Sequence, residues 1–571
     1  MERVTDVTEI EGKAGREAGQ AARAAALAGL AALALCVLSG GGAKAQTTPQ
    51  GQSREQAQTA ARGAFDQLQQ GGDARVLVPQ LLAALEQAGL PRTGLVALSV
   101  LAQADHAAVR TQARTELFLR AQAGFALAQM LVAQQPGLEN DAPAELQAKL
   151  ARAHLERALA DQPPEQGASF ASASATAPPE TVDPASASSK EELLRARALA
   201  AEVPAGSAVA GEAGEVRGLA ALAAGDDDAA QREFAALVSP RAEAGPSDGI
   251  SAARRQRAIL QLARLAYARG DDASAIALYA KVSRAAPEWL DALFESSWAR
   301  FRRGEDEKAL GNLLTLHAPF FQGHYFPESY VLKALLLYEN CRYADATRTL
   351  AEFERSYRPV HDGLAAELAR VSTPQLAAEL LLQGPHAGTS QIQGPARAEV
   401  ERLVFAPELV ADGRAAEDVA AELDSFDARA PDFRSSALAR AVLPGLRAAR
   451  MELLDQAGRG VRARLASARS ELRELLAQSL RLSYEIAGRE QELARAGGPA
   501  LPLSQRAQRS LPQVGEDEEL WPFQGEYWRD ELGSYQFTLG EHCQRSAPGV
   551  PAQIGVTAPT VRAEGSDPGR P

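Results

Sequence analysis

A glycine recurs at one position in a repeated pattern of two helical runs. Gly225, Gly270 and Gly304 each follow an apolar helical run and precede Asp or Glu residues, after which a second run begins. Gly270 and Gly304 lie 34 residues apart. Aligned on the glycines, each unit has an alanine five residues later and a larger side chain four residues beyond it: Ala230 and Phe234, Ala275 and Tyr279, Ala309 and Leu313. Since glycine permits a tight turn and alanine lets two helices approach closely, we expect stacked helical hairpins.

A fourth unit fits the same register with an insertion of three residues. Ala334 occupies the small position of its first helix, Ala346 lies 37 residues after Ala309, and Cys341 replaces the turn glycine. A 34-residue helix–turn–helix period with small residues at the helix contacts resembles the tetratricopeptide repeat (TPR), over about residues 207–359. The resemblance implies a solenoid whose first helices line a concave groove that binds a segment of another protein.

The composition favours helices throughout the chain. Ala, Leu, Arg and Glu are abundant, β-branched residues are sparse, and aromatic residues make up only 5%. This excludes a β-sandwich or barrel and disfavours a parallel α/β sheet. The net charge of −13 argues against nucleic-acid binding through a basic surface. The predicted fold is all-α: a TPR-like helical-hairpin solenoid, then a long heptad-patterned helix arranged as a coiled-coil-like hairpin, then an aromatic C-terminal segment.

Changes in composition and patterning divide the chain into seven predicted regions. An Ala/Ser/Pro-rich stretch has the composition of a flexible, disordered linker and marks a domain boundary. Past Pro359 we expect shorter helices, interrupted at prolines such as Pro407, Pro431 and Pro444. The regions are 1–45 (signal peptide), 46–161 (N-terminal helices that could be degenerate repeats), 162–189 (linker), 190–359 (repeats), 360–500 (helical region), 501–545 (aromatic and acidic segment) and 546–571 (disordered tail).

Apolar residues alternate at spacings of four and three within the helix expected over residues 461–495. This seam comprises Val461, Leu465, Ala468, Leu472, Leu475, Ser479, Leu482, Ile486 and Leu493. It predicts one long helix ending near Arg495. Because Ala468 and Ser479 weaken the seam, an intramolecular antiparallel hairpin, and hence a monomer, is favoured over a coiled-coil dimer.

An uncharged apolar run, Ala24–Leu38, lies near the N-terminus. Ala43 and Ala45 follow in the small-x-small arrangement that signal peptidase recognises, so we expect cleavage after Ala45 and export to the periplasm. Two alternatives stay open. The run could be an uncleaved membrane anchor, or Cys36 could carry a lipid, since residues 33–36 have the outline of a lipobox.

Export would leave Cys341 and Cys543 as the cysteines of the mature chain, in an oxidising compartment. A single disulfide between them is one interpretation. Two unrelated free thiols are the other.

The C-terminal segment is unusually aromatic for this chain. Two of the four tryptophans, Trp521 and Trp528, lie here with Phe523, Tyr527, Tyr535 and Phe537. So dense a group should be buried, either against the helical body, which we favour, or in a partner. The ending around WPFQGEYWRDELG resembles that of exported, repeat-containing proteins of δ-proteobacterial (myxobacterial) type, and this resemblance implies no activity.

Register with the repeat family predicts the groove residues. Phe294, Trp298 and Phe301 form a turn-spaced aromatic stripe flanked by arginine, which suits a peptide anchor. The alternative is that these rings pack against neighbouring helices or the C-terminal segment. The predicted partner-binding residues are Arg257, Arg264, Tyr267, Asp291, Phe294, Trp298, Phe301, Arg302 and Tyr338, with Leu260, Val331 and Leu335 on the same face.

No sequence pattern indicates catalysis. Nucleotide-binding, zinc-protease and nucleophile-elbow motifs are missing, and the seven histidines are scattered. We therefore expect no enzyme, no cofactor and no metal site. The predicted function is a protein-binding scaffold of the bacterial cell envelope, with a role in assembly, division or motility. A self-associating structural envelope protein and a cell-wall-acting enzyme are the alternatives.

Overall fold

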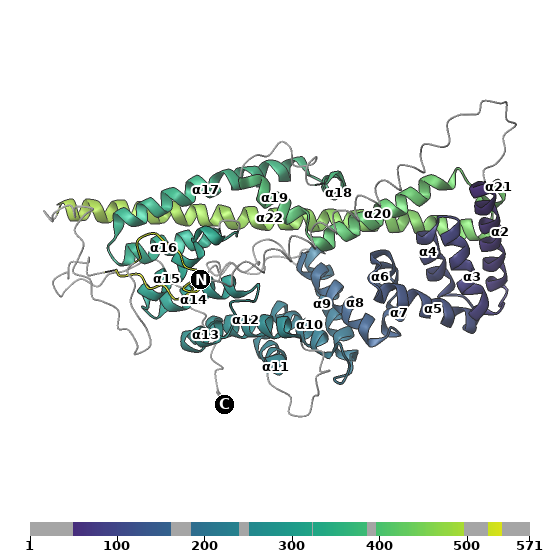
Figure 1. Cartoon of the computed structure of the whole chain (residues 1–571), viewed down its shortest axis with the longest axis horizontal. Coiled ribbons are helices and arrows are strands. Elements are labelled where there is room, and N and C mark those ends of the chain that lie inside the picture. The colour runs from purple at the N-terminus through teal and green to yellow at the C-terminus, as the bar shows by residue number, and fades with distance from the viewer. Residues whose placement is uncertain are drawn as a thin grey trace, which may run out of the picture. The chain divides into compact units, whose positions relative to one another are not determined.

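Every regular element that the structure describes is helical. The computed structural model describes residues 49–160, 184–238, 251–321, 324–384, 395–495 and 523–539, and within these ranges there is no strand (Figure 1). Contacts divide the chain after Gln56, and the fold described below is that of the unit from Ala57 onwards. The predicted all-α class is confirmed.

Short helices joined by glycine turns form the N-terminal part. Gly71, Gly89 and Gly124 follow three of these helices with φ angles of 83°, 73° and 93°, in the left-handed region that glycine enters at little cost. The helices are α2 (Pro49–Gln69), α3 (Ala74–Gln87), α4 (Pro91–Leu101), α5 (Ala107–Gln122), α6 (Ala126–Ala133), α7 (Pro136–Asn140) and α8 (Ala144–Ala160).

Four helical hairpins follow with the predicted turns. Gly225, Gly270 and Gly304 have φ angles of 74°, 79° and 71°. Cys341 has a φ of 58° and is the one non-glycine residue with positive φ in the described ranges, so it adopts the turn geometry of the glycine it replaces. α9 (Pro184–Glu202) precedes these hairpins. Their helices are α10 (Ala210–Ala223), α11 (Asp227–Val238), α12 (Ala252–Ala268), α13 (Asp272–Tyr279), α14 (Trp289–Arg302), α15 (Asp306–Leu316), α16 (Pro327–Glu339) and α17 (Tyr343–Arg370), with a 3-10 turn at Pro319–Phe321.

The small positions of the repeat lie at the helix contacts. Ala230, Ala275, Ala309 and Ala346 are fully buried where the second helix of each hairpin meets the first. Phe234, Tyr279 and Leu313, four residues further on, are buried as well. The consecutive hairpins are consistent with the predicted solenoid.

The predicted linker joins two helices of one core. α9 begins at Pro184, inside the stretch predicted as linker, and residues 161–183 lie outside the described residues. α8 and α9 pack against each other and against α10. One buried cluster includes Leu155 before the stretch and Leu199 after it.

Two prolines lie inside helices. Pro359, the predicted end of the repeat region, is within α17, which has 28 residues, and Pro444 is within the 59-residue α22 (Ala437–Arg495). The predicted break at Pro444 is wrong. A proline inside a helix removes a hydrogen bond and crowds the preceding turn. Here apolar side chains on both sides of each proline are buried, such as Val442 and Leu446 around Pro444, and this packing offsets the cost.

The heptad seam is covered by other helices of the same chain. α22 ends at Arg495 as predicted, and all the predicted seam residues except Leu493 are buried. Figure 1 shows α17, α18 (Pro374–Gln383) and α20 (Pro407–Phe426) alongside α22, and these helices make its most extensive contacts. α19 (Pro395–Val404) and the short α21 (Pro431–Arg434) pack on it too.

The described part of the aromatic segment, residues 523–539, docks on the chain's own helices. Leu539 belongs to the buried cluster of α14, α15 and α16, and Phe537 packs against it. Trp528, by contrast, is 54% exposed. Docking on the body therefore holds for the end of the segment, whereas Trp521 lies outside the described residues.

Cys341 forms a disulfide. The chain's other two cysteines, Cys36 and Cys543, lie outside the described residues, so the pairing with Cys543 stays a prediction. The signal run, the cleavage site after Ala45 and the tail 546–571 lie outside them too. No helix in the described ranges is both long and apolar enough to cross a membrane.

Truncating the seam should destabilise the protein strongly. Leu472 is fully buried on α22, so Leu472→Ala should lower the free energy of unfolding by about 2–5 kcal/mol in chemical denaturation. Leu480, on the same helix but 53% exposed, provides the control, and Leu480→Ala should cost less than about 1 kcal/mol. Equal losses for the two variants would contradict the seam.

Candidate functional site

The first helices of the hairpins lie side by side. α10 contacts α12, α12 contacts α14, and α14 contacts α16, while α8 packs beside α10. The residues predicted to bind a partner lie on α12, α14 and α16. We call the surface formed by Arg257, Arg264, Tyr267, Asp291, Trp298 and Arg302 the first-helix face.

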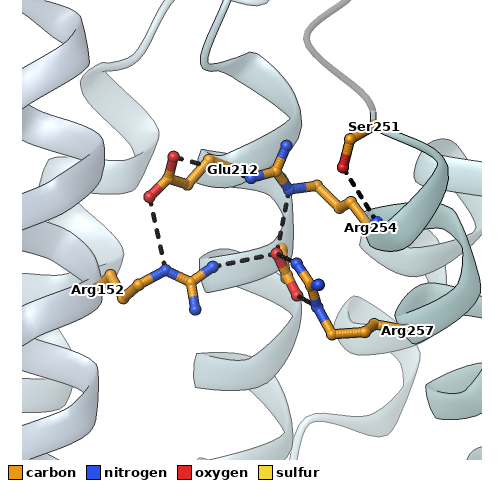
Figure 2. Close-up of polar contacts among 6 residues, drawn as sticks. Arg152, Glu212, Ser251, Arg254 and Arg257 are labelled. Carbon is orange, nitrogen blue, oxygen red and sulfur yellow. Dashed lines mark hydrogen bonds and ion pairs between the residues drawn. The ribbon is translucent and has the colours of Figure 1, made fainter. Parts of the chain in front are cut away.

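The Glu215 carboxylate joins three of these helices. It is buried on α10 and accepts hydrogen bonds from Arg152 Nη2 on α8 at 3.0 Å and from Arg254 Nε on α12 at 3.1 Å. Arg257 donates two hydrogen bonds to the same carboxylate, from Nε at 2.6 Å and from Nη2 at 3.0 Å. Figure 2 shows the arginines converging from both neighbouring helices, with Glu212 pairing with Arg152 and Arg254 as a second carboxylate.

The charges around Glu215 favour its ionised form. Burial alone would raise the pKa of this carboxyl, but the hydrogen bonds from Arg257 and Arg254 and the charge of Arg152 outweigh burial and lower the pKa. The same contact raises the pKa of Arg257. Glu215 is therefore ionised at neutral pH and fixes the spacing of α8, α10 and α12.

A second buried carboxylate links α12 to α14. Glu295 accepts bonds from Arg264 Nε at 3.0 Å and from Arg264 Nη2 at 2.6 Å. Burial raises the pKa of the Glu295 carboxyl, and the Arg264 guanidinium offsets only part of that rise. The planar guanidinium matches the carboxylate with two parallel bonds, which sets the angle between the groups as well as their distance.

Arg302 of α14 contacts Tyr267 at the C-terminal end of α12. Its guanidinium lies 4.4 Å from the centroid of the Tyr267 ring, and its Nη1 donates to the Tyr267 carbonyl at 3.2 Å. Its Nε lies 3.2 Å from Asp272 Oδ2, at the start of α13. Burial is the main reason why the pKa of Tyr267 is raised.

The aromatic stripe takes part in the core. Phe294 is buried against Phe326, with ring centroids 5.9 Å apart, and Trp298 meets Phe301 edge to face at 6.0 Å. Trp298 and Phe301 are only half-buried, and they pack against the cluster that contains Ile486 of α22.

The remaining predicted residues lie around this stripe. Tyr338 packs against Tyr343 with ring centroids 5.7 Å apart, and it adjoins the same cluster as Leu335. Asp291 is half-buried, and burial raises its pKa. Leu260 and Val331 are buried. The structure thus brings the three predicted arginines into ion pairs with carboxylates of other helices, and the rings into a mixed core and surface cluster.

The sequence did not reveal the carboxylates that bind the arginines of the first-helix face. Glu215 and Arg257 are 42 residues apart, and Arg264 and Glu295 are 31 apart. Each pair spans two hairpins, so no spacing within a single helix reveals it. Arg152 was missed because it lies before the predicted linker. Among the described residues, no three His, Cys, Asp or Glu side chains are grouped so that they could hold a metal ion.

Replacing Glu215 should destabilise the protein in a pH-dependent way. Glu215→Gln removes the anion from between three guanidinium groups, and we expect a loss of about 2–4 kcal/mol of unfolding free energy at pH 7. Since the folded-state pKa of Glu215 is lowered, its stabilising contribution is present above the ordinary value of 4.5 and is lost as the pH falls through the folded-state pKa.

The measurement is urea denaturation of both proteins at pH 7 and at lower pH. The difference between wild type and Glu215→Gln should shrink as the pH falls below 4.5. Glu202→Gln, an exposed glutamate on α9, is the matched control and should match wild type throughout. If the difference in unfolding free energy between wild type and Glu215→Gln does not change with pH, the ionised Glu215 carboxylate does not stabilise the fold.

Comparison with known proteins adds no family assignment. Neither a scan against protein-family models nor a search of curated proteins found a match to this chain. The resemblance to the tetratricopeptide repeat therefore rests on the residues quoted above, and the function is argued from the geometry of the first-helix face.

Proposed function

We propose that this chain is a non-enzymatic scaffold that binds a segment of another protein of the bacterial cell envelope across its first-helix face. The main support is the hydrogen bonding and exposure of two arginine side chains. Arg257 and Arg264 each donate hydrogen bonds from Nε and Nη2 to a buried carboxylate. Within the described residues, the Nη1 of neither arginine donates a hydrogen bond. Their side chains are 39% and 36% exposed.

Such arginines are prepared for binding. Their carboxylate partners hold them in place, so little side-chain freedom remains to be lost when a partner arrives. Arg257 and Arg264 are seven residues apart on α12, which places their Cα atoms on one face about 10 Å apart. Their Nη1 donors suit backbone carbonyls or acidic side chains of a bound segment.

The aromatic neighbours provide the apolar part of the surface. Trp298 and Phe301 are half-buried on α14, beside the helix that carries the arginines. A partly exposed tryptophan near fixed arginines is the composition typical of binding hot spots. The envelope location rests on the N-terminal run, Ala24–Leu38, and on the small residues that follow it.

Burial of the α22 seam supports the scaffold over the self-associating alternative. The seam residues that would form a coiled-coil dimer are covered by α17, α18 and α20. Sedimentation of the purified chain addresses this directly. A monomer fits the proposal, and a stable dimer or trimer would favour the structural alternative.

Changing the two arginines to lysine should weaken binding and preserve the fold. The double variant Arg257→Lys, Arg264→Lys keeps a positive charge beside Glu215 and Glu295 but loses both Nη1 donors. In a pull-down from envelope extract, quantified by mass spectrometry, we expect retention of the partner to fall at least about tenfold, because up to two charged hydrogen bonds are lost.

Two further variants separate binding from stability. Arg269→Lys changes an exposed arginine at the end of the same helix and should retain the partner fully. Trp298→Ala should weaken capture with little change in melting temperature. If Trp298→Ala melts much earlier, that ring is core, and if the lysine double variant retains the same proteins as wild type, the first-helix face is not the binding site.

A further inference from the structure

His154 is a fully buried histidine where α7, α8 and α9 meet. It lies on α8, and none of its side chain is exposed. Its Nε2 is 2.6 Å from Glu139 Oε1 on α7, and its Nδ1 is 2.6 Å from Glu192 Oε2 on α9. Each ring nitrogen therefore faces a carboxylate from a different neighbouring helix.

Only the protonated ring can bind both carboxylates. A neutral imidazole carries one N–H donor, whereas the imidazolium carries two. A carboxylate accepts hydrogen bonds and donates none, so a neutral ring would place a lone pair against one of the two oxygens. The contacts are thus those of a histidine cation, whose charge also offsets the burial of the Glu139 carboxylate.

Arg157 offers the neutral ring another partner. It follows His154 by three residues and so lies on the same face of α8. Its Nη2 is 2.8 Å from His154 Nδ1, and its Nε is 3.2 Å from Glu192 Oε2. When Nδ1 carries a proton, it donates to Glu192 and is repelled by the guanidinium. When Nδ1 carries none, it accepts a hydrogen bond from Arg157.

The charges on α7 and α9 favour the protonated ring. Burial lowers the pKa of His154, but the hydrogen bonds to Glu139 and Glu192 outweigh both burial and the charge of Arg157, so the pKa is raised from 6.5. Burial would likewise raise the pKa of Glu192. The hydrogen bond from His154 and the charges of Arg157 and Arg195 lower it instead.

The other helices that pack on α8 direct their charges elsewhere or contribute apolar side chains. α10 provides Glu212 and Glu215, and both pair with Arg152. α5 and α22 contribute Leu117 and Leu453 to the buried cluster that α8 enters. The protonation of the histidine is therefore governed by the three charged residues that contact its ring.

We propose that His154 is a proton-dependent switch at the contact of α8 with α9. The doubly protonated ring binds Glu192 and ties α9 to α8. On deprotonation the Nδ1 proton passes through Glu192, whose side chain is 19% exposed, to water, and Nδ1 then accepts a hydrogen bond from Arg157. Nε2 keeps its proton, because Glu139 is only 4% exposed and gives it no route to water.

The sign of the pH dependence follows from this exchange of partners. The folded-state pKa of His154 is raised, so its stabilising contribution is present below 6.5 and is lost as the pH rises through the folded-state pKa. α9 is thus held more tightly at acidic pH and less tightly at alkaline pH.

NMR titration of the full-length protein, labelled with nitrogen isotope in histidine, tests the switch at the ring. The His154 signal is assigned by its absence from His154→Gln or, if that variant does not fold, by removing the other histidines one at a time. We expect a midpoint above 6.5 and loss of the proton from Nδ1 alone. A midpoint at or below 6.5, or loss of the Nε2 proton, would overturn the proposal.

Two substitutions should move this midpoint in opposite directions. Glu192→Gln removes the carboxylate charge and should lower the midpoint by about one pH unit or more, whereas Arg157→Met removes the repelling cation and should raise it. Glu191→Gln, at the neighbouring exposed glutamate of α9, is the matched control and should leave the midpoint unchanged. If the two substitutions shift the midpoint in the same direction or not at all, Nδ1 does not alternate between these partners.

Hydrogen exchange of the full-length protein tests whether the ring controls α9. After correction for the intrinsic pH dependence of exchange, protection of the α9 amides should fall as the pH rises through the midpoint. The fall should reach up to about tenfold for each pH unit by which the midpoint exceeds 6.5, and it should be smaller in Glu192→Gln. Peptides from α17 serve as the internal control. Protection of α9 that changes no more than that of α17 would contradict the switch.

Discussion

Burial of the α22 seam is the interaction on which the rest of the fold depends. Side chains from this one helix enter four separate buried clusters, beginning with Leu438 and ending with Ile486. Its partners include α4 near the N-terminus and α16 to α20 further along the chain. Because the chain is rich in alanine and only 5% aromatic, each short helix buries little apolar area, and a long common helix gathers enough of it.

The hairpins add a second constraint, which is electrostatic. Their left-handed turns at Gly225, Gly270, Gly304 and Cys341 set the direction of each second helix, but turns alone do not fix the distance between neighbouring first helices. The buried carboxylates Glu215 and Glu295 do so, because each binds arginine from an adjacent helix with two-point geometry. Arg257 and Arg264 of the first-helix face are thus structural, and their Nη1 donors make them available for binding as well.

The sequence indicated those features that depend on local spacing. The hairpin turns, the small helix contacts and the seam of α22 each follow from residues a few positions apart, and all are where the spacing put them. A break at Pro444 was predicted wrongly because packing on both sides of this proline outweighs the lost hydrogen bond, as it does at Pro359 within α17. Glu215 and Glu295 were missed because their arginine partners lie in the neighbouring hairpin, 42 and 31 residues away, and a single sequence carries no local signal for such pairs.

The geometry of α14 separates the first-helix face from the docked C-terminal segment. A Cβ on Gly533 of that segment would lie 3.0 Å from the Trp289 ring and 3.9 Å from Leu293, so these two residues face the segment. Glu295, which binds Arg264, and Trp298 follow Trp289 by six and nine residues. At about 100° per residue they point to roughly the opposite side of the helix. A partner can therefore bind the first-helix face while the C-terminal segment stays docked.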